Sequence, residues 1–290
     1  MKPPTHVGDG RWTLAELLGR GTFGEVYRAT DARGGPDAAI KLLSKAMSRH
    51  KKVLARFVRE AQLLERIDHP GIVRLVDWDQ SADRPWLAIE LAEHGTAWDW
   101  SHKHGPMPPR LATRTMLQVC SAVAAAHAAG VVHRDIKPSN VLFAARGVVK
   151  VCDFGIAHDA LAPATLTMPG TRMGSLGYMA PEQRRDATGA TIVSDVFSTA
   201  AVLFSLLTAY DPLDLARDLP PYRGRIDDRL YRLIRVATDD VPAGRPQTIE
   251  AFADGLHAAL PDLPADPKGV CIPGEEASLL EAARTAIPTE

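Results

Sequence analysis

The sequence has few of the features that mark secreted, membrane-bound or metal-binding proteins. Its three cysteines, Cys120, Cys152 and Cys271, stand far apart and form no pair with metal-ligand spacing. No apolar run reaches the roughly 18 residues that a membrane span needs, and the first residues, 1–10, contain no apolar signal segment. We therefore expect a soluble protein in the reducing environment of the cytoplasm.

Strong charge of one sign is also missing. The formal net charge of the 290 residues is -1, so we expect no overall attraction to nucleic acid or to an anionic membrane. Repeats and low-complexity segments are absent. Of the residues, 46% are hydrophobic and 24% are charged. A chain of this length and composition can bury a substantial core in one large domain or two lobes.

The most informative stretch is His-Arg-Asp-Ile-Lys-Pro-Ser-Asn at residues 133–140, followed by Asp-Phe-Gly at residues 153–155. Asp135 can accept the proton of an attacking hydroxyl, and Lys137 can reach a transferring phosphoryl group as a point charge. Asn140 and Asp153 supply oxygen atoms, the hard ligands that magnesium prefers. These residues at this separation predict a phosphoryl-transfer site that uses ATP and Mg²⁺ or Mn²⁺.

Both motifs resemble the catalytic loop and the metal-binding motif of the eukaryotic-like serine/threonine protein kinases. The resemblance covers about residues 11–260, and an alanine- and arginine-rich chain of this kind suggests a bacterial source. It implies an α+β, two-lobed kinase fold, with a small β-rich amino-terminal lobe that has one main helix and a larger helical carboxy-terminal lobe. We expect an extension at residues 1–10, lobes at 11–91 and 96–260, and a tail at 261–290.

A glycine-rich segment lies between two stretches that alternate as β-strands do, at residues 12–19 and 25–31. Glycines let a backbone close over phosphates without a Cβ in the way. Dinucleotide-binding proteins share the G-x-G-x-x-G pattern, but there a helix follows directly, whereas here a strand follows and Val26 fits the kinase form. The residues expected to contact ATP from this segment are Gly19, Arg20, Gly21, Thr22, Phe23, Gly24 and Val26.

A third predicted strand, at residues 38–43, contains Ala39-Ile40-Lys41, which resembles the family motif V-A-I-K. Lys41 is expected to hold the α- and β-phosphates of ATP. A lone lysine at a strand end is more often a solvated charge. However, helical spacing over residues 53–67 places Glu60 where the family has the acidic partner of this lysine. Glu65 and Glu93 are the alternative partners.

The resemblance also assigns the residues around the adenine and the ribose. It puts Ile89 at the gatekeeper position, Glu90 to Ala92 at the hinge and Thr96 beside the ribose, with Ala39 and Leu142 as further ATP contacts. The complete predicted catalytic set is Asp135, Lys137, Lys41 and Glu60, and the metal ligands, which also contact ATP, are Asn140 and Asp153.

In the second half of the chain, helices are predicted at residues 108–129, 191–207 and 249–260, and short strands at 141–144 and 148–152. Asp195 resembles the buried aspartate that anchors the family's catalytic loop. His127 fits a core position, and Cys152 is either a small buried residue or a redox switch. Three prolines interrupt the region between residues 207 and 227, which looks shorter than in the family. The tail either packs on the body or binds a partner.

Residues 153–182 show little regular pattern, as expected of an activation loop. Their ending, residues 174–182, resembles the family's G-T-x-x-Y-x-A-P-E with Ser175 in place of threonine, and Arg245 resembles the arginine that pairs with its glutamate, Glu182. Small-molecule kinases generally lack this ending, so the expected substrates are protein serine and threonine hydroxyls. Arg134 before the base goes with activation by loop phosphorylation. The candidate phosphosites, in order, are Thr171, Thr167 and Thr165, and self-association would allow them to be phosphorylated in trans.

The sequence therefore predicts a non-specific serine/threonine protein kinase with a role in signalling. Two alternatives belong to other classes: a pseudokinase that binds nucleotide or partners without turnover, and a kinase of a small molecule. No catalytic position is substituted, which disfavours the first, and the A-P-E ending disfavours the second.

Overall fold

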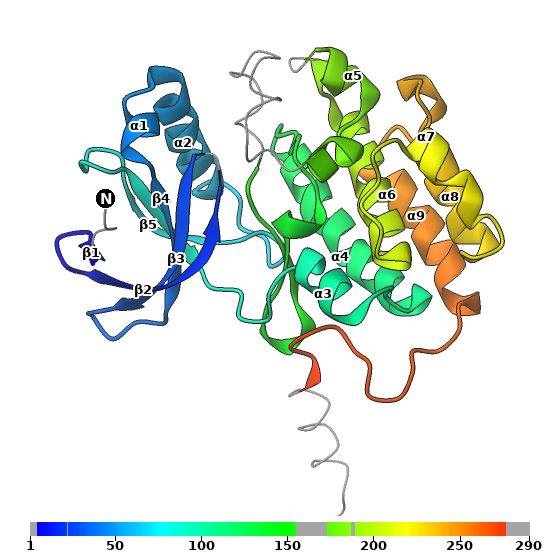
Figure 1. Cartoon of the computed structure of the whole chain (residues 1–290), viewed down its shortest axis with the longest axis horizontal. Helices are drawn as coiled ribbons and strands as arrows, with labels where there is room; N and C mark the ends of the chain where they lie inside the picture. Colours follow the sequence, from blue (N-terminus) through cyan, green and yellow to red (C-terminus); the bar gives the residue numbers. More distant parts are fainter. Residues whose placement is uncertain (1–4, 22, 155–172, 187–188, 277–290) are drawn as a thin grey trace, which may run out of the picture. The chain divides into compact units, whose positions relative to one another are not determined.

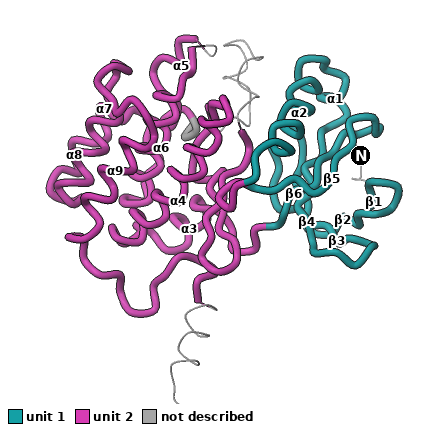
Figure 2. Tube along the Cα trace, turned by 180° about the vertical axis from the view of Figure 1, so that it is seen from behind, with its two compact units in different colours: residues 1–68, 73–91, 156–171 teal, residues 69–72, 92–155, 172–290 magenta. Residues whose placement is uncertain are grey.

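The computed structural model describes residues 5–21, 23–154, 173–186 and 189–276. The chain divides into two compact units (Figure 2). Of the described residues, unit 1 comprises 5–21, 23–68 and 73–91, and unit 2 comprises 69–72, 92–154, 173–186 and 189–276. Unit 1 is rich in strands and unit 2 in helices, so the predicted α+β fold with two lobes is confirmed.

Unit 1 is an antiparallel sheet of six strands in the order β1-β2-β3-β4-β6-β5 (Figure 1). Its helices are the short α1 (Lys45–Ser48) and the longer α2 (Lys51–Leu64). β1 was not predicted and pairs with the start of β2. The strands are β1 (His6–Val7), β2 (Trp12–Arg20), β3 (Gly24–Asp31), β4 (Ala38–Leu43), β5 (Leu75–Asp79) and β6 (Trp86–Glu90).

The strand register decides which side of the sheet Lys41 occupies. Lys41 lies opposite Val26 on β3 and opposite Leu87 on β6, and paired residues share a face of the sheet. Leu87 packs against Val53 and Phe57 of α2 in one apolar cluster. The alternation of β4 therefore directs Lys41 to the face that α2 covers. The opposite face is filled by a second cluster made of Trp12, Tyr27, Ala29, Ala38, Ile40, Leu42, Trp86 and Ala88.

Unit 2 is built around two apolar helices, α4 (Pro109–Ala128) and α6 (Ile192–Thr208), which pack against each other and against α9 (Ile249–Ala259). Nearly every residue of α6 is buried, which explains its unbroken apolar sequence. In the described parts of the chain, no helix is both long and apolar enough to cross a membrane. The remaining elements are α3 (Ala97–His104), β7 (Val141–Phe143), β8 (Val149–Val151), α5 (Pro181–Arg185), α7 (Leu215–Asp218) and α8 (Asp228–Ala237).

The predicted elements are present with ends shifted by a few residues. The helix expected at residues 53–67 starts at Lys51 and stops at Leu64, and the strand expected at residues 148–152 spans Val149–Val151. Between residues 207 and 227, only α7 and a single 3-10 turn form, consistent with the prolines there. α3 and α8 were not predicted.

Candidate active site

A single buried carboxylate holds the catalytic-loop motif. Asp195 lies in α6 with no exposed surface and accepts the backbone N–H groups of His133 and Arg134, each at 2.8 Å. Nε2 of His127, on α4, lies 2.8 Å from the same carboxylate. Arg134 has a φ of 67°, a backbone conformation that a non-glycine residue keeps only where its surroundings hold it. Asp195 thus anchors the loop, and His127 is a core residue that supports the anchor.

His133 links the loop to the Asp-Phe-Gly motif. Its ring is fully buried, accepts the N–H of Asp135 at Nδ1 (3.2 Å) and contacts the carbonyl oxygen of Cys152 through Nε2 (3.1 Å). Burial lowers the pKa of His133, although the carboxylates of Asp195 and Asp135 oppose this. The neutral ring therefore donates to Cys152 and accepts from Asp135. Cys152 itself is buried, as expected of a small apolar residue.

The side chain of Asp135, the predicted base, is positioned by two neighbours. Nζ of Lys137 donates to its Oδ2 at 2.7 Å. Nδ2 of Asn140 donates to the carbonyl oxygen of Asp135 (2.8 Å) and to Oδ2 (3.2 Å). Burial alone would lower the pKa of Lys137, but the charges of Asp135 and Asp153 outweigh it and the pKa is raised. Lys137 is therefore a fixed cation beside Asp135, the predicted base.

The predicted metal ligands fit a magnesium ion by their chemistry. Because Nδ2 of Asn140 is bound to Asp135, the oxygen Oδ1 is the side-chain atom that Asn140 can offer to a cation. Asp153 follows β8 with a φ of 56°, a strained conformation for an aspartate. In the described ranges, no cluster of three or more His, Cys, Asp or Glu side chains could hold a metal alone. Two oxygen donors suit Mg²⁺, which commonly takes its other ligands from phosphates and water.

Unit 1 contains the expected ion pair between strand and helix. Nζ of Lys41, on β4, lies 2.8 and 2.9 Å from the two carboxylate oxygens of Glu60, on α2. Glu60 is only 9% exposed. Of the alternative partners, Glu65 accepts the indole N–H of Trp78 at 2.9 Å, and Glu93 is exposed and belongs to unit 2. Glu60 is thus the glutamate that pairs with Lys41.

The glycine-rich segment forms the turn between β2 and β3. Gly21 N–H donates to the carbonyl oxygen of Gly24 at 2.9 Å, which closes the turn. A Cβ at Gly24 would overlap the carbonyl oxygen of Leu42, so only glycine allows β3 to approach β4 this closely. The backbone oxygen of Phe23 accepts the N–H of Ser44 (2.9 Å). Arg20, on the outside of the turn, pairs with Glu25 at 2.9 Å.

The predicted adenine contacts span the end of β6. Ile89 pairs with Ala39 of β4, on the same face of the sheet as Lys41. Glu90 is fixed by Arg74, whose N–H donates to its carboxylate at 2.7 Å and whose carbonyl oxygen accepts its N–H at 2.9 Å. Ile89 and Glu90 belong to unit 1, and Ala92 begins the next part of unit 2.

The predicted ribose contact, Thr96, caps the first turn of α3. Its hydroxyl accepts the N–H of Asp99 (3.0 Å) and its own backbone N–H donates to the carboxylate of Asp99 (2.9 Å), a capping box that the sequence T-x-x-D could have revealed. Thr96 also bridges to Leu142 on β7 as in an antiparallel ladder. The structure thus brings Thr96 and Leu142 together.

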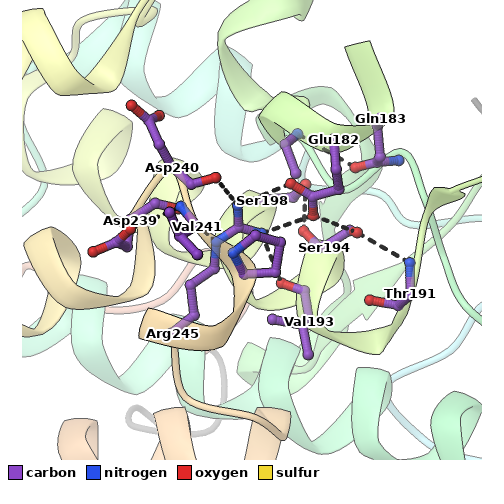
Figure 3. A network of polar contacts seen from close by, with 12 residues as sticks. Glu182, Gln183, Thr191, Val193, Ser194, Ser198, Asp239, Asp240, Val241 and Arg245 are labelled. Atoms are coloured by element: carbon purple, nitrogen blue, oxygen red, sulfur yellow. Dashed lines mark hydrogen bonds and ion pairs between the residues drawn. The ribbon is translucent and has the colours of Figure 1, made fainter. Parts of the chain in front are cut away.

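The A-P-E ending is fastened by a buried ion pair (Figure 3). Arg245 donates to both oxygens of Glu182, at 2.8 and 2.9 Å, and its side chain has no exposed surface. It also donates to the carbonyl oxygen of Asp239 at 2.7 Å. Ser194 donates to Glu182 at 2.7 Å. Burial would raise the pKa of Glu182, but the hydrogen bonds from Arg245 and Ser194 prevail and lower it.

Two further side chains at this ending, Tyr178 and Gln183, make long-range contacts that were not predicted. Tyr178 donates its hydroxyl proton to Asp211 and lies 2.6 Å from both Asp211 and Ser205, while burial raises its pKa. Gln183 donates to the carbonyl oxygen of Arg134 at 3.1 Å, which ties the ending to the catalytic loop. Nothing local in the sequence signals these long-range partners. Some predicted site positions lie outside the described residues: Thr22, Thr165, Thr167 and Thr171, together with the side chain of Ser175.

Comparisons with known proteins agree with this geometry. A family model described as "Protein kinase domain" matches residues 12–262. The serine/threonine-protein kinase PknB of Mycobacterium leprae is 36% identical over 217 residues, which cover 73% of this chain and 34% of PknB. PknL of Mycobacterium tuberculosis is 32% identical over 269 residues, which cover 88% of this chain and 67% of PknL.

Among solved structures, the PknI kinase domain of Mycobacterium tuberculosis is similar with a TM-score of 0.68 and 26% identity. The match covers 89% of this chain and 99% of that domain. The chain spans about a third of the length of PknB, so what PknB does as a whole is not transferred to it.

Proposed function

This chain belongs to the protein kinase family, among relatives that are bacterial serine/threonine kinases, and we propose that it transfers the γ-phosphate of ATP to serine and threonine hydroxyls of proteins. The observation that carries the proposal is the arrangement around Asp135. Its backbone N–H is held by His133, its carbonyl oxygen by Asn140, and its carboxylate by both Lys137 and Asn140. A carboxylate that is held in place before the reaction is suited to act as a general base.

In this proposal, Asp135 accepts the proton of the substrate hydroxyl while Lys137 neutralises charge that develops beside it. Bound Mg²⁺ would neutralise phosphate charge, and Asn140 and Asp153 are the residues that would hold it. Lys41, oriented by Glu60, binds the α- and β-phosphates. The backbone of residues 19–24 covers the phosphates, and Val26, Ala39, Ile89, Glu90, Ala92, Thr96 and Leu142 contact the adenine and the ribose.

A protein substrate is favoured over a small molecule by the way residues 178–182 are held. Four side chains from distant parts of the chain, Ser194, Ser205, Asp211 and Arg245, bind Tyr178 or Glu182. A segment that is held in place by so many contacts can support an extended peptide substrate. We further propose a kinase domain at residues 11–260, with loop phosphorylation at Thr171 as its regulation.

The test is to incubate the purified chain with Mg²⁺, labelled ATP and a mixed protein substrate, beside Asp135→Asn, and to map the phosphosites by mass spectrometry. We expect phosphoserine and phosphothreonine from the wild type and a rate about 10²- to 10⁴-fold lower from the variant. ATP binding without any phosphate transfer would instead support a pseudokinase. Transfer to small molecules alone would support the other alternative.

A further inference from the structure

The segment that follows the family match packs against unit 2. Residues 263–276, which we call the strap, follow the 3-10 turn Leu260–Asp262 at the end of α9 and run to the hairpin of β7 and β8 (Figure 1). Two strap residues are deeply buried, Leu263 at 3% and Ile272 at 1% exposure. The strap is therefore part of the folded unit although it lies beyond residue 262, where the family model ends.

Two arginines of α4 attach the strap. Arg110 donates to the carbonyl oxygen of Leu263 at 3.0 Å. Arg114 lies 2.5 Å from the carboxylate of Glu275 and 3.7 Å from that of Asp266. The second oxygen of Asp266 is buried without a hydrogen-bond partner among the described residues. Arg114 thus compensates two carboxylates, one near each end of the strap.

The far end of the strap touches the turn between β7 and β8. Gly274 has a φ of 85°, and a Cβ there would overlap the carbonyl oxygen of Ala144 and lie 2.8 Å from the ring of His94. The side chain of Glu275 lies against Gly147, at the tip of the same turn. Only glycine satisfies both the backbone angle and the contact at position 274.

The two segments that the strap touches, around His94 and Ala144, also contain two of the proposed nucleotide contacts, Thr96 and Leu142. The backbone N–H of His94 donates to the carbonyl oxygen of Phe143 at 3.0 Å, and the backbone N–H of Phe143 donates to the carbonyl oxygen of Gly95 at 2.9 Å. The next pair of this short ladder is Thr96 with Leu142. A displacement of His94 or Ala144 is therefore transmitted through these hydrogen bonds to the adjoining pair.

We propose that the strap is a positioning element that keeps Thr96 and Leu142 in place for the ribose and the base. This inference rests on the proposed function, because Thr96 and Leu142 are ATP contacts only in that proposal. Gly274 supplies the contact with the ladder, and Arg114 keeps the strap attached to α4. Neither residue takes part in phosphoryl transfer.

The test uses the full chain with Gly274→Val, Arg114→Ala and Arg114→Lys. The matched control is Arg229→Ala, because Arg229 forms a surface ion pair with Asp262 at 3.0 Å, just before the strap. Four quantities are measured: the Kd for MgADP by calorimetry, kcat, the KM for ATP, and the hydrogen-exchange rates of the amides in residues 94–96 and 141–147.

We expect Gly274→Val and Arg114→Ala to raise the Kd for MgADP and the KM for ATP roughly threefold or more, with kcat nearly unchanged. The amide hydrogen of Phe143 should exchange faster in both variants. Arg114→Lys should recover much of the nucleotide affinity that Arg114→Ala loses, and Arg229→Ala should match the wild type in every measurement. If Gly274→Val does not fold, Arg114→Ala alone decides.

Unchanged Kd and exchange in a folded variant would overturn the proposal, and so would a fall in kcat or melting temperature with Kd constant, which indicates a merely structural role. The proposed function fails separately, if the wild type neither binds MgADP nor transfers phosphate. In that case faster amide hydrogen exchange in the variants would still show that the strap supports the ladder. Unchanged amide exchange would show that the strap does not support it.

Discussion

Two pairs of a basic residue and a glutamate, one in each unit, look alike in sequence but differ in their surroundings. In unit 1, the side chains of Lys41 and Glu60 are 24% and 12% exposed. In unit 2, the side chain of Arg245 has no exposure, donates to a backbone carbonyl as well as to Glu182, and lies with its guanidinium 5.0 Å from the ring of Phe197.

The difference fits the proposal that the Lys41 pair serves binding and that the Arg245 pair serves folding. The planar guanidinium of Arg245 is used in full by protein acceptors, which leaves nothing for a ligand. The ammonium of Lys41 is a partly accessible point charge that Glu60 orients. Breaking the Arg245 pair should therefore cost stability, and breaking the Lys41 pair should cost activity.

The largest expected effect comes from Arg245→Met. Removal of Arg245 leaves the Glu182 carboxylate partly buried without its cation, which should destabilise the protein by about 3–5 kcal/mol. The melting temperature should fall by roughly 10 °C. Arg229→Met, which breaks an exposed pair, should change stability by about 1 kcal/mol or less. Equal melting curves for the two variants would contradict the structural role of Arg245.

Lys41→Met should do the reverse. Loss of one preorganised cation at the phosphates lowers kcat by roughly 10²- to 10³-fold, while the thermal melt stays cooperative and close to that of the wild type. Lys45→Met is the control, because Lys45 belongs to the same unit and pairs with the exposed Asp83. Full activity of Lys41→Met, or an equal loss in the control, would show that Lys41 does not bind the phosphates.

Both pairs could be predicted because their residues stand in motifs that resemble those of the protein kinases. The same resemblance gave the buried Asp195. Strands β2, β3 and β4 and the apolar helices α4 and α6 were instead predicted from their own local sequence patterns. Local chemistry determines these features, so a local pattern is enough to find them.

Other elements depended on signals that were weak or distant. α8 carries a usable signal, because Asp227 caps it and Leu230 and Ile234 have helical spacing, but ten residues give little periodicity. The strap has no periodic pattern at all. Its position depends on Arg114, more than 150 residues from both Asp266 and Glu275, and no local rule links residues so far apart.

The loss of the free energy of unfolding at low pH should depend on Glu182. Because its pKa is lowered in the folded state, its ion pair stabilises the protein above the ordinary glutamate value of 4.5 and stops doing so as the pH falls through the lower, folded value. Glu182→Gln should therefore cost about 1.5–3 kcal/mol at pH 7. The gap between the variant and the wild type, measured by urea unfolding, should narrow below pH 4.5. A gap that stays constant with pH would mean that the carboxylate charge is not what holds Arg245.

The smallest effect is expected for Glu60→Gln, which keeps the shape and one acceptor oxygen but removes the charge that orients Lys41. Lys41 itself remains, so kcat should fall only about tenfold, because a misdirected cation still attracts the phosphates. Glu65→Gln is the matched control on the same stretch of chain, since Glu65 binds Trp78 rather than Lys41. If Glu65→Gln lowers kcat as much as Glu60→Gln does, the total negative charge near α2 determines kcat, and the specific contact between Glu60 and Lys41 does not. If Glu60→Gln is as inactive as Lys41→Met, the glutamate does more than orient the lysine, and the two residues must be treated as one catalytic unit.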